Sequence, residues 1–160
     1  MATTATNKQP LLVDRPFHSV VESNSLTSGS ATSLDILGTN ESSVLVDCTS
    51  NDGAIVEDLY VIARSTVSYK AGFYLSTAVD YLRPNDATYI QQIDSATTAG
   101  QITSCTSLPK VLAPLPGTGS DSQVRALYIP KGSVLWCSLQ LAGPANSAGT
   151  PVIAAQGGFY

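Results

Sequence analysis

Short apolar runs separated by turn residues dominate the chain. The clearest run, Ile55–Ala63, carries apolar residues on both parities, which predicts a central strand covered on both faces. In Gly72–Leu82, Phe73, Leu75, Val79 and Tyr81 lie on one parity. Ile129-Pro130-Lys131-Gly132 has the composition of a tight turn and predicts a hairpin. The other predicted strands are Thr32–Leu37, Ser43–Cys48, Ala87–Ile93, Val124–Ile129, Val134–Leu141 and Val152–Ala155, and residues 94–106 are predicted to form a loop.

No stretch shows a sustained period of 3.6 residues, and helix-forming residues are scarce, with three Glu, four Lys and one Met. Regular short strands separated by Gly and Pro turns are typical of two-sheet folds. We therefore predict an all-β chain, a jelly-roll-like β-sandwich of eight or nine short antiparallel strands, with a closed barrel as the alternative.

The first 33 residues have a different character from the remainder. Residues 1–22 combine a polar leader with an apolar cluster, and Pro10 and Pro16 disfavour a continuous helix there. Residues 23–33 are rich in Ser, Thr and Gly and predict a flexible linker. The predicted organisation is an extended N-terminal arm at 1–22, a linker at 23–33 and a β-sandwich domain at 34–160.

Charge is unusually sparse. Only 12% of the 160 residues are charged, against about 25% in a typical soluble domain. The net charge is −4 and no two basic residues are adjacent, so the sequence offers no footprint for nucleic acid or for an anionic membrane. We expect a chain made in a cytoplasm, without a membrane partner, whose surface of hydroxyls and small side chains packs against other protein.

The chain offers little catalytic chemistry. His18 is the single histidine, and no nucleophile elbow or phosphate-binding loop is present. We expect no enzyme and no cofactor or metal. Asp47, Asp52 and Asp58 flank a predicted hairpin, which leaves structural calcium as a weaker alternative to solvated carboxylates.

Two residue types invite a functional interpretation but have a plainer one. Cys48, Cys105 and Cys137 are predicted to be free, buried thiols, because three widely spaced cysteines without a secretory signal do not predict a disulfide framework. Trp136 lies mid-strand and is predicted to be buried between the two sheets. The alternative is an exposed Trp on a sugar-stacking platform.

Four segments carry a resemblance to a known group of proteins. They are the start Ala2–Arg15, Asp52–Asp58, Ile129–Gly132 and the ending Ala155–Tyr160. Together they resemble small virion structural proteins of tailed phages, particularly phages of marine cyanobacteria. The resemblance implies a β-sandwich subunit, trimeric or arrayed, with no enzymatic site.

These observations lead to a capsid decoration or cement subunit as the expected function, located in the virion. The expected partners are other copies of the chain, as a homotrimer, and the major capsid protein. The alternative is a tail or fibre component, including a carbohydrate-binding receptor module. The residues predicted to contact other subunits are Leu11, Leu12, Val13, Arg15, Phe17, His18, Phe159 and Tyr160.

Overall fold

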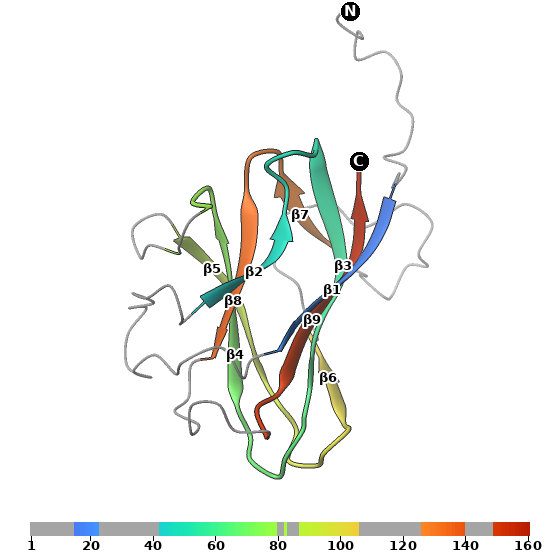
Figure 1. Cartoon of the computed structure of the whole chain (residues 1–160), viewed down its shortest axis with the longest axis vertical. Helices are drawn as coiled ribbons and strands as arrows, with labels where there is room; N and C mark the ends of the chain where they lie inside the picture. The colour runs from blue at the N-terminus through green and yellow to red at the C-terminus, as the bar shows by residue number, and fades with distance from the viewer. Residues whose placement is uncertain (1–14, 23–41, 80–81, 83–86, 106–125, 140–148) are drawn as a thin grey trace, which may run out of the picture.

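The computed structural model of the chain describes residues 15–22, 42–79, 82, 87–105, 126–139 and 149–160. These residues form nine strands and no helix, arranged as two antiparallel sheets packed face to face (Figure 1). The strands are β1 Arg15–Glu22, β2 Ser42–Asp47, β3 Gly53–Ile62, β4 Lys70–Ser76, β5 Ala87–Asp94, β6 Ile102–Ser104, β7 Leu127–Pro130, β8 Val134–Leu139 and β9 Val152–Phe159.

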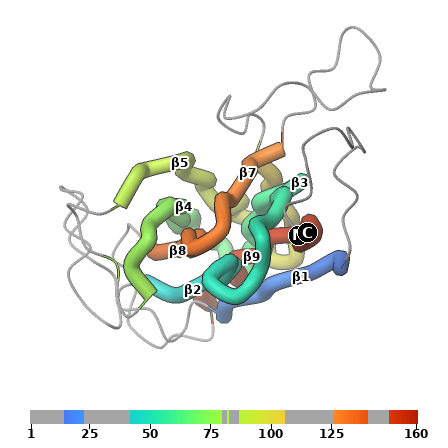
Figure 2. The backbone as a smooth tube through the Cα atoms, turned by 90° about the horizontal axis from the view of Figure 1, so that it is seen from above, coloured from blue at the N-terminus to red at the C-terminus, as the bar shows by residue number. Residues whose placement is uncertain are grey.

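The order of the strands is that of a jelly roll. Sheet A runs β1-β9-β3-β6, with β7 also paired to β3, and sheet B runs β2-β8-β4-β5. Since β9 occupies one edge of β3 along most of its length, β6 and β7 share the other edge, at Tyr60–Ile62 and Gly53–Val56 respectively. They act as one interrupted strand, and two four-stranded sheets then face each other, as in a jelly roll. Figure 2 shows the two layers from above. The predicted β-sandwich is confirmed.

The core lies between the sheets. Strand β3 contributes Val56, Leu59 and Val61, and each of these residues is fully buried. Opposite them, β8 contributes Leu135 and Cys137 from sheet B. Strands β3 and β8 each have a neighbour on both sides in their sheets, and both are apolar along most of their length.

The segment predicted as a docking arm is partly a strand of the sandwich. Residues 15–22 form β1, which pairs with β9 along its whole length, so the domain boundary expected at residue 22 is corrected to include them. The side chains alternate: Phe17 and Val21 pack against the core, whereas His18 and Val20 are exposed. Pro16 is compatible with this position because, among the described strands, β1 lies at the edge of sheet A and pairs on one side only.

The predicted hairpin between β7 and β8 is wrong. A tight turn is present, in which the Ser133 amide donates to the Pro130 carbonyl at 3.1 Å and Gly132 adopts a φ of +79°. However, β7 belongs to sheet A and β8 to sheet B, so the turn is a corner between sheets. The same applies to Ser43–Cys48 and Ile55–Ala63, which the structure places in different sheets rather than in one hairpin.

Other boundaries differ at the ends of the strands. The predicted loop 94–106 contains the short strand β6, β4 ends at Ser76 rather than Leu82, and β9 continues through Gly157 and Gly158. The linker at 23–33 and the strand Thr32–Leu37 lie outside the described residues.

Candidate functional site

Three of the predicted interaction residues come together where β1 begins and β9 ends. The rings of Phe17 and Phe159 lie 4.8 Å apart at an interplanar angle of 43°. The guanidinium carbon of Arg15 lies 5.8 Å from the centre of the Phe159 ring. Register explains this cluster, because antiparallel pairing places Arg15 opposite Phe159 and Phe17 opposite Gly157. Leu11, Leu12 and Val13 lie outside the described residues.

Tyr160 is held by the loop before β3. Its amide donates to the Gly53 carbonyl at 3.3 Å, and its carbonyl accepts from the Asp52 amide at 3.1 Å. Its ring stacks on Tyr128 with centroids 5.7 Å apart. Gly53 is needed beneath it, because a Cβ there would lie 2.8 Å from both the Tyr160 hydroxyl and the Ile129 carbonyl oxygen. Both Phe159 and Tyr160 therefore contribute to the sandwich's own packing.

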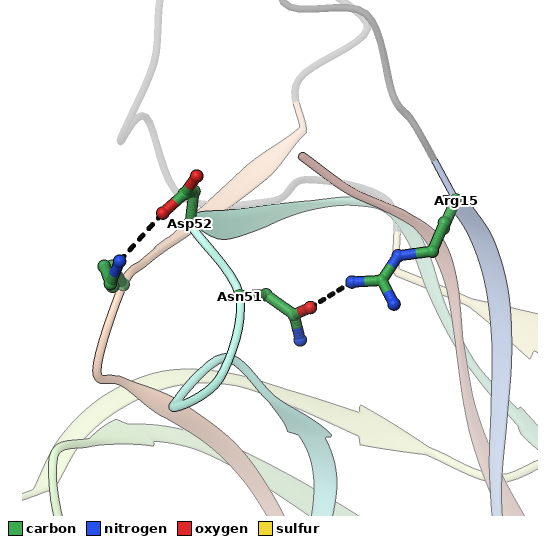
Figure 3. A network of polar contacts seen from close by, with 4 residues as sticks. Arg15, Asn51 and Asp52 are labelled. Carbon is green, nitrogen blue, oxygen red and sulfur yellow. Dashed lines mark hydrogen bonds and ion pairs between the residues drawn. The ribbon is translucent and has the colours of Figure 1, made fainter. Parts of the chain in front are cut away.

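Two polar contacts lie side by side at this end of the molecule (Figure 3). Arg15 donates a hydrogen bond to the side-chain oxygen of Asn51. Lys131 forms an ion pair with Asp52 at 2.8 Å, and its hydrogen bond and positive charge lower the pKa of the Asp52 carboxyl. Since the Lys131 and Asp52 side chains are 67% and 74% exposed, this pair contributes little to stability.

Polar side chains of β1 reach across β9 to its far side. Besides the Arg15–Asn51 contact, His18 shares a hydrogen bond with the Tyr60 hydroxyl, and Glu22 pairs with Arg64 at 3.0 Å. We call Arg15, His18 and Glu22 the β1 clasp. Strand β9 lies between these partners, and its Ala-Ala-Gln-Gly-Gly stretch leaves room for the crossings.

The outer face of sheet A carries an exposed apolar area between polar groups. Val20 is 50% exposed and Ile102 is 58% exposed. Between them in the sheet lie Tyr60 and Ile62, both half-buried. We call these four residues the face A patch. The surrounding positions carry polar or charged side chains: His18, Glu22, Asp58, Arg64, Ser104 and Gln156. A central apolar area with a polar rim is the usual anatomy of a protein interface.

Trp136 is buried, but not between the sheets as predicted. It is 4% exposed and belongs, with Tyr74, Val134 and Leu82, to a second cluster separate from the main core. Its neighbours Leu135 and Cys137 face the main core, so the indole lies on the outer face of sheet B. There its Nε1 donates to the Ala78 carbonyl at 3.1 Å. This burial contradicts an exposed Trp platform.

Farther along the same outer face, strand β5 presents Tyr89, which is 43% exposed. Tyr74 stands opposite it across the β4–β5 ladder and lies opposite Trp136 on the other side. An aromatic row therefore crosses sheet B from its buried middle to its exposed β5 edge.

The acidic residues and the cysteines are dispersed. Asp47 accepts from the Thr49 amide and hydroxyl, Asp52 pairs with Lys131, and Asp58 accepts from Ser104, so the three carboxylates have separate partners. Within the described ranges, no three His, Cys, Asp or Glu side chains gather where they could hold a metal ion. All three cysteines are free thiols; Cys48 and Cys137 are buried, and Cys105 is half-buried.

Sequence reasoning missed the residues that the structure singles out on the outer faces of the two sheets. Tyr60, Ile62, Ile102 and Tyr89 were not among the predicted interaction residues. A signal existed for Tyr60 and Ile62, because Ile55–Ala63 is apolar on both parities and a strand turns only one of its two faces toward the core. Ile102 lies in a three-residue strand that is too short to show alternation.

No protein-family model matches the sequence, and comparisons with curated proteins and with solved structures yield no significant match. In the described part of the chain, no helix has the length and hydropathy needed to cross a membrane.

Proposed function

We propose that this chain is a structural subunit of a tailed-phage virion that decorates the capsid and stabilises the head through contacts between subunits. The observation that carries the proposal is the face A patch. A sandwich needs one apolar face per sheet to form its core, and Val20, Ile62 and Ile102 lie on the opposite face of sheet A. An apolar face beyond the core's requirement indicates a surface that another protein covers.

Three further features support a structural role. The jelly-roll order of the strands occurs in viral capsid domains, although fold alone does not establish function. Only 12% of the residues are charged, which suits a surface buried in an assembly. The contacts of the β1 clasp fix the strand that carries Val20, so the patch is presented on a rigid sheet.

The proposed partners are the major capsid protein and other copies of the chain, as a homotrimer. The face A patch contacts the capsid protein across junctions of the shell. Burying an aliphatic side chain contributes about 1.5–3 kcal/mol, and many copies of a subunit give a strong total interaction from modest individual affinities.

Binding of the purified protein to phage capsids that lack it tests this proposal. Val20→Lys and Ile102→Lys each place a charge within the face A patch, and each is expected to reduce the bound protein at least about tenfold. Val67→Lys is the matched control, because Val67 is 54% exposed but lies in the loop between β3 and β4. Circular dichroism verifies that the variants remain folded. Equal binding by the patch variants and the control would contradict the proposal, as would failure of the wild type to bind.

A further inference from the structure

The outer face of sheet B presents an exposed aromatic ring held firmly from one side. Tyr89 is 43% exposed, while Tyr74 beside it is 1% exposed. The two rings meet edge to face, with centroids 5.5 Å apart at 63°. Because Tyr74 is fixed within the cluster around Trp136, Tyr89 is a preorganised platform at the β5 edge.

A polar pair lies next to this ring on the same face. Gln92 Nε2 donates to Asp94 Oδ1 at 2.7 Å, which fixes the orientation of the amide. Its carbonyl oxygen and the second carboxylate oxygen are acceptors by chemistry. Burial raises the pKa of the Tyr89 phenol, and the neighbouring Tyr74 and the charge of Asp94 raise it further. The cross-strand partners of Tyr89, Gln92 and Asp94 are Tyr74, Gly72 and Lys70, which alternate along β4, so the three residues follow one another on the outer face of sheet B. We call them the face B cluster.

The row that contains Gln92 continues into the sheet. Gly72 stands opposite Gln92 on one side and opposite Ser138 on the other. Gly72 has no side chain, so β4 places no side chain between these two residues. The Ser138 hydroxyl is buried, with the residue 2% exposed, and it has no hydrogen-bond partner in the described part of the chain. An unpaired buried hydroxyl is costly, and this one lies in the same cross-strand row as Gln92.

We propose that the face B cluster is a binding site for a neutral saccharide. A pyranose ring has an apolar face that suits the Tyr89 ring and outward hydroxyls that donate to Asp94 and Gln92. An apolar peptide fits less well, because it would bury the Gln92–Asp94 pair without replacing its hydrogen bonds to water. This site is separate from the face A patch, so it adds a second activity to the proposed decoration role.

The test uses the isolated full-length protein and saturation-transfer NMR with the methyl glycosides of glucose, galactose, mannose and N-acetylglucosamine. At least one glycoside is expected to bind with a dissociation constant on the order of 1 mM, typical of a shallow site with one platform. Tyr89→Ala and Asp94→Ala are each expected to weaken that binding at least about tenfold. Tyr89→Phe retains the ring and is expected to retain most of the binding.

Thr88→Ala is the matched control, because Thr88 is exposed on the same strand and belongs to the opposite parity. It is expected to bind like the wild type. Absence of binding by all four glycosides would overturn the proposal, and so would equal binding by Tyr89→Ala and the wild type. Neither result depends on attachment to capsids, so failure of this site and failure of the decoration role are distinguishable.

Discussion

The guanidinium group of Arg15 donates a hydrogen bond to the side-chain oxygen of Asn51, although 36 positions separate the two residues in the sequence. This contact joins the start of β1 to the loop that leads into β3. It spans the end of β9, the strand that pairs with both β1 and β3. The edge of the sandwich is fastened at this point.

A double-mutant cycle on Arg15→Ala and Asn51→Ala measures this contact. Each single variant is expected to lower the free energy of unfolding, with a coupling energy of about 0.5–1.5 kcal/mol, typical of a net hydrogen bond. Arg15→Ala is expected to cost more than Asn51→Ala, because Arg15 also lies over the Phe159 ring. Urea denaturation of the four proteins checks this. Strictly additive effects would show that the contact does not fasten β1.

Two truncations distinguish the contribution of β1 from that of residues 1–14. Deleting residues 1–22 removes β1, including the core contacts of Phe17 and Val21, and is expected to abolish cooperative unfolding. Deleting residues 1–14 keeps β1 and is expected to leave the β-sheet circular dichroism unchanged. If Leu11, Leu12 and Val13 contact another subunit, the shorter deletion also weakens capsid binding. Cooperative unfolding of the 1–22 deletion, measured by thermal melting, would contradict the assignment of β1 to the sandwich.

At Gly157 the backbone of β9 lies very close to the backbone of β3. A Cβ at this position would lie 2.0 Å from the Ile55 carbonyl oxygen and 2.9 Å from the Val56 Cα. Since neither atom belongs to a flexible side chain, Gly157→Ala must push β9 away from β3. We expect a loss of about 4 kcal/mol or more in the free energy of unfolding.

The control for this variant is Gly100→Ala. Gly100 adopts a φ of +86° and would place its Cβ in open space. It should lose only about 1–2 kcal/mol, the cost of the left-handed backbone. Chemical denaturation compares the two, and similar losses would mean that β9 and β3 tolerate a wider spacing.

The three thiols are expected to differ in reactivity. Burial raises the pKa of Cys137 to about 12. Burial and the nearby Asp47 carboxylate raise the pKa of Cys48 to about 11. Because the thiolate is the reactive form, both should resist a disulfide reagent at about pH 8 in the native protein. Cys105 is half-buried and should react first. Rapid titration of all three thiols without denaturant would contradict the native burial of Cys48 and Cys137.

Local sequence patterns predicted where the strands lie better than they predicted which strands pair. The apolar content of Val134–Leu141 correctly indicated a strand whose described part, β8, is buried on both faces. Ile55–Ala63 is a central strand as predicted, but its outer face carries the half-buried Tyr60 and Ile62. The turn before Val134 has the same local chemistry in a hairpin and in a corner between sheets, so its Pro and Gly do not show which sheet follows. Trp136 shows the same limit: both faces of β8 are covered, so parity does not reveal which cluster receives the indole.

Of the candidate site, the sequence predicted only residues in or directly beside the first and last strands, β1 and β9. Phe17 and Phe159 were both chosen from the sequence, and the β1–β9 register brings them together. The polar contacts of Arg15 and His18 depend on pairings between strands that are distant in the sequence. Nothing local to Asn51 or Tyr60 indicates contact with Arg15 or His18. In β1, the alternation of Phe17 and Val21 with exposed residues was present in the sequence, but the neighbouring prolines favoured an extended arm.

The most direct test of the proposed virion role is electron cryo-microscopy of particles from a phage whose genome encodes this chain, as the proposal requires. The proposal predicts repeated density for the sandwich over the head, with Val20, Ile62 and Ile102 facing the major capsid protein. Density confined to the tail, absence of the chain from the particle, or a sheet A outer face turned toward solvent would contradict it.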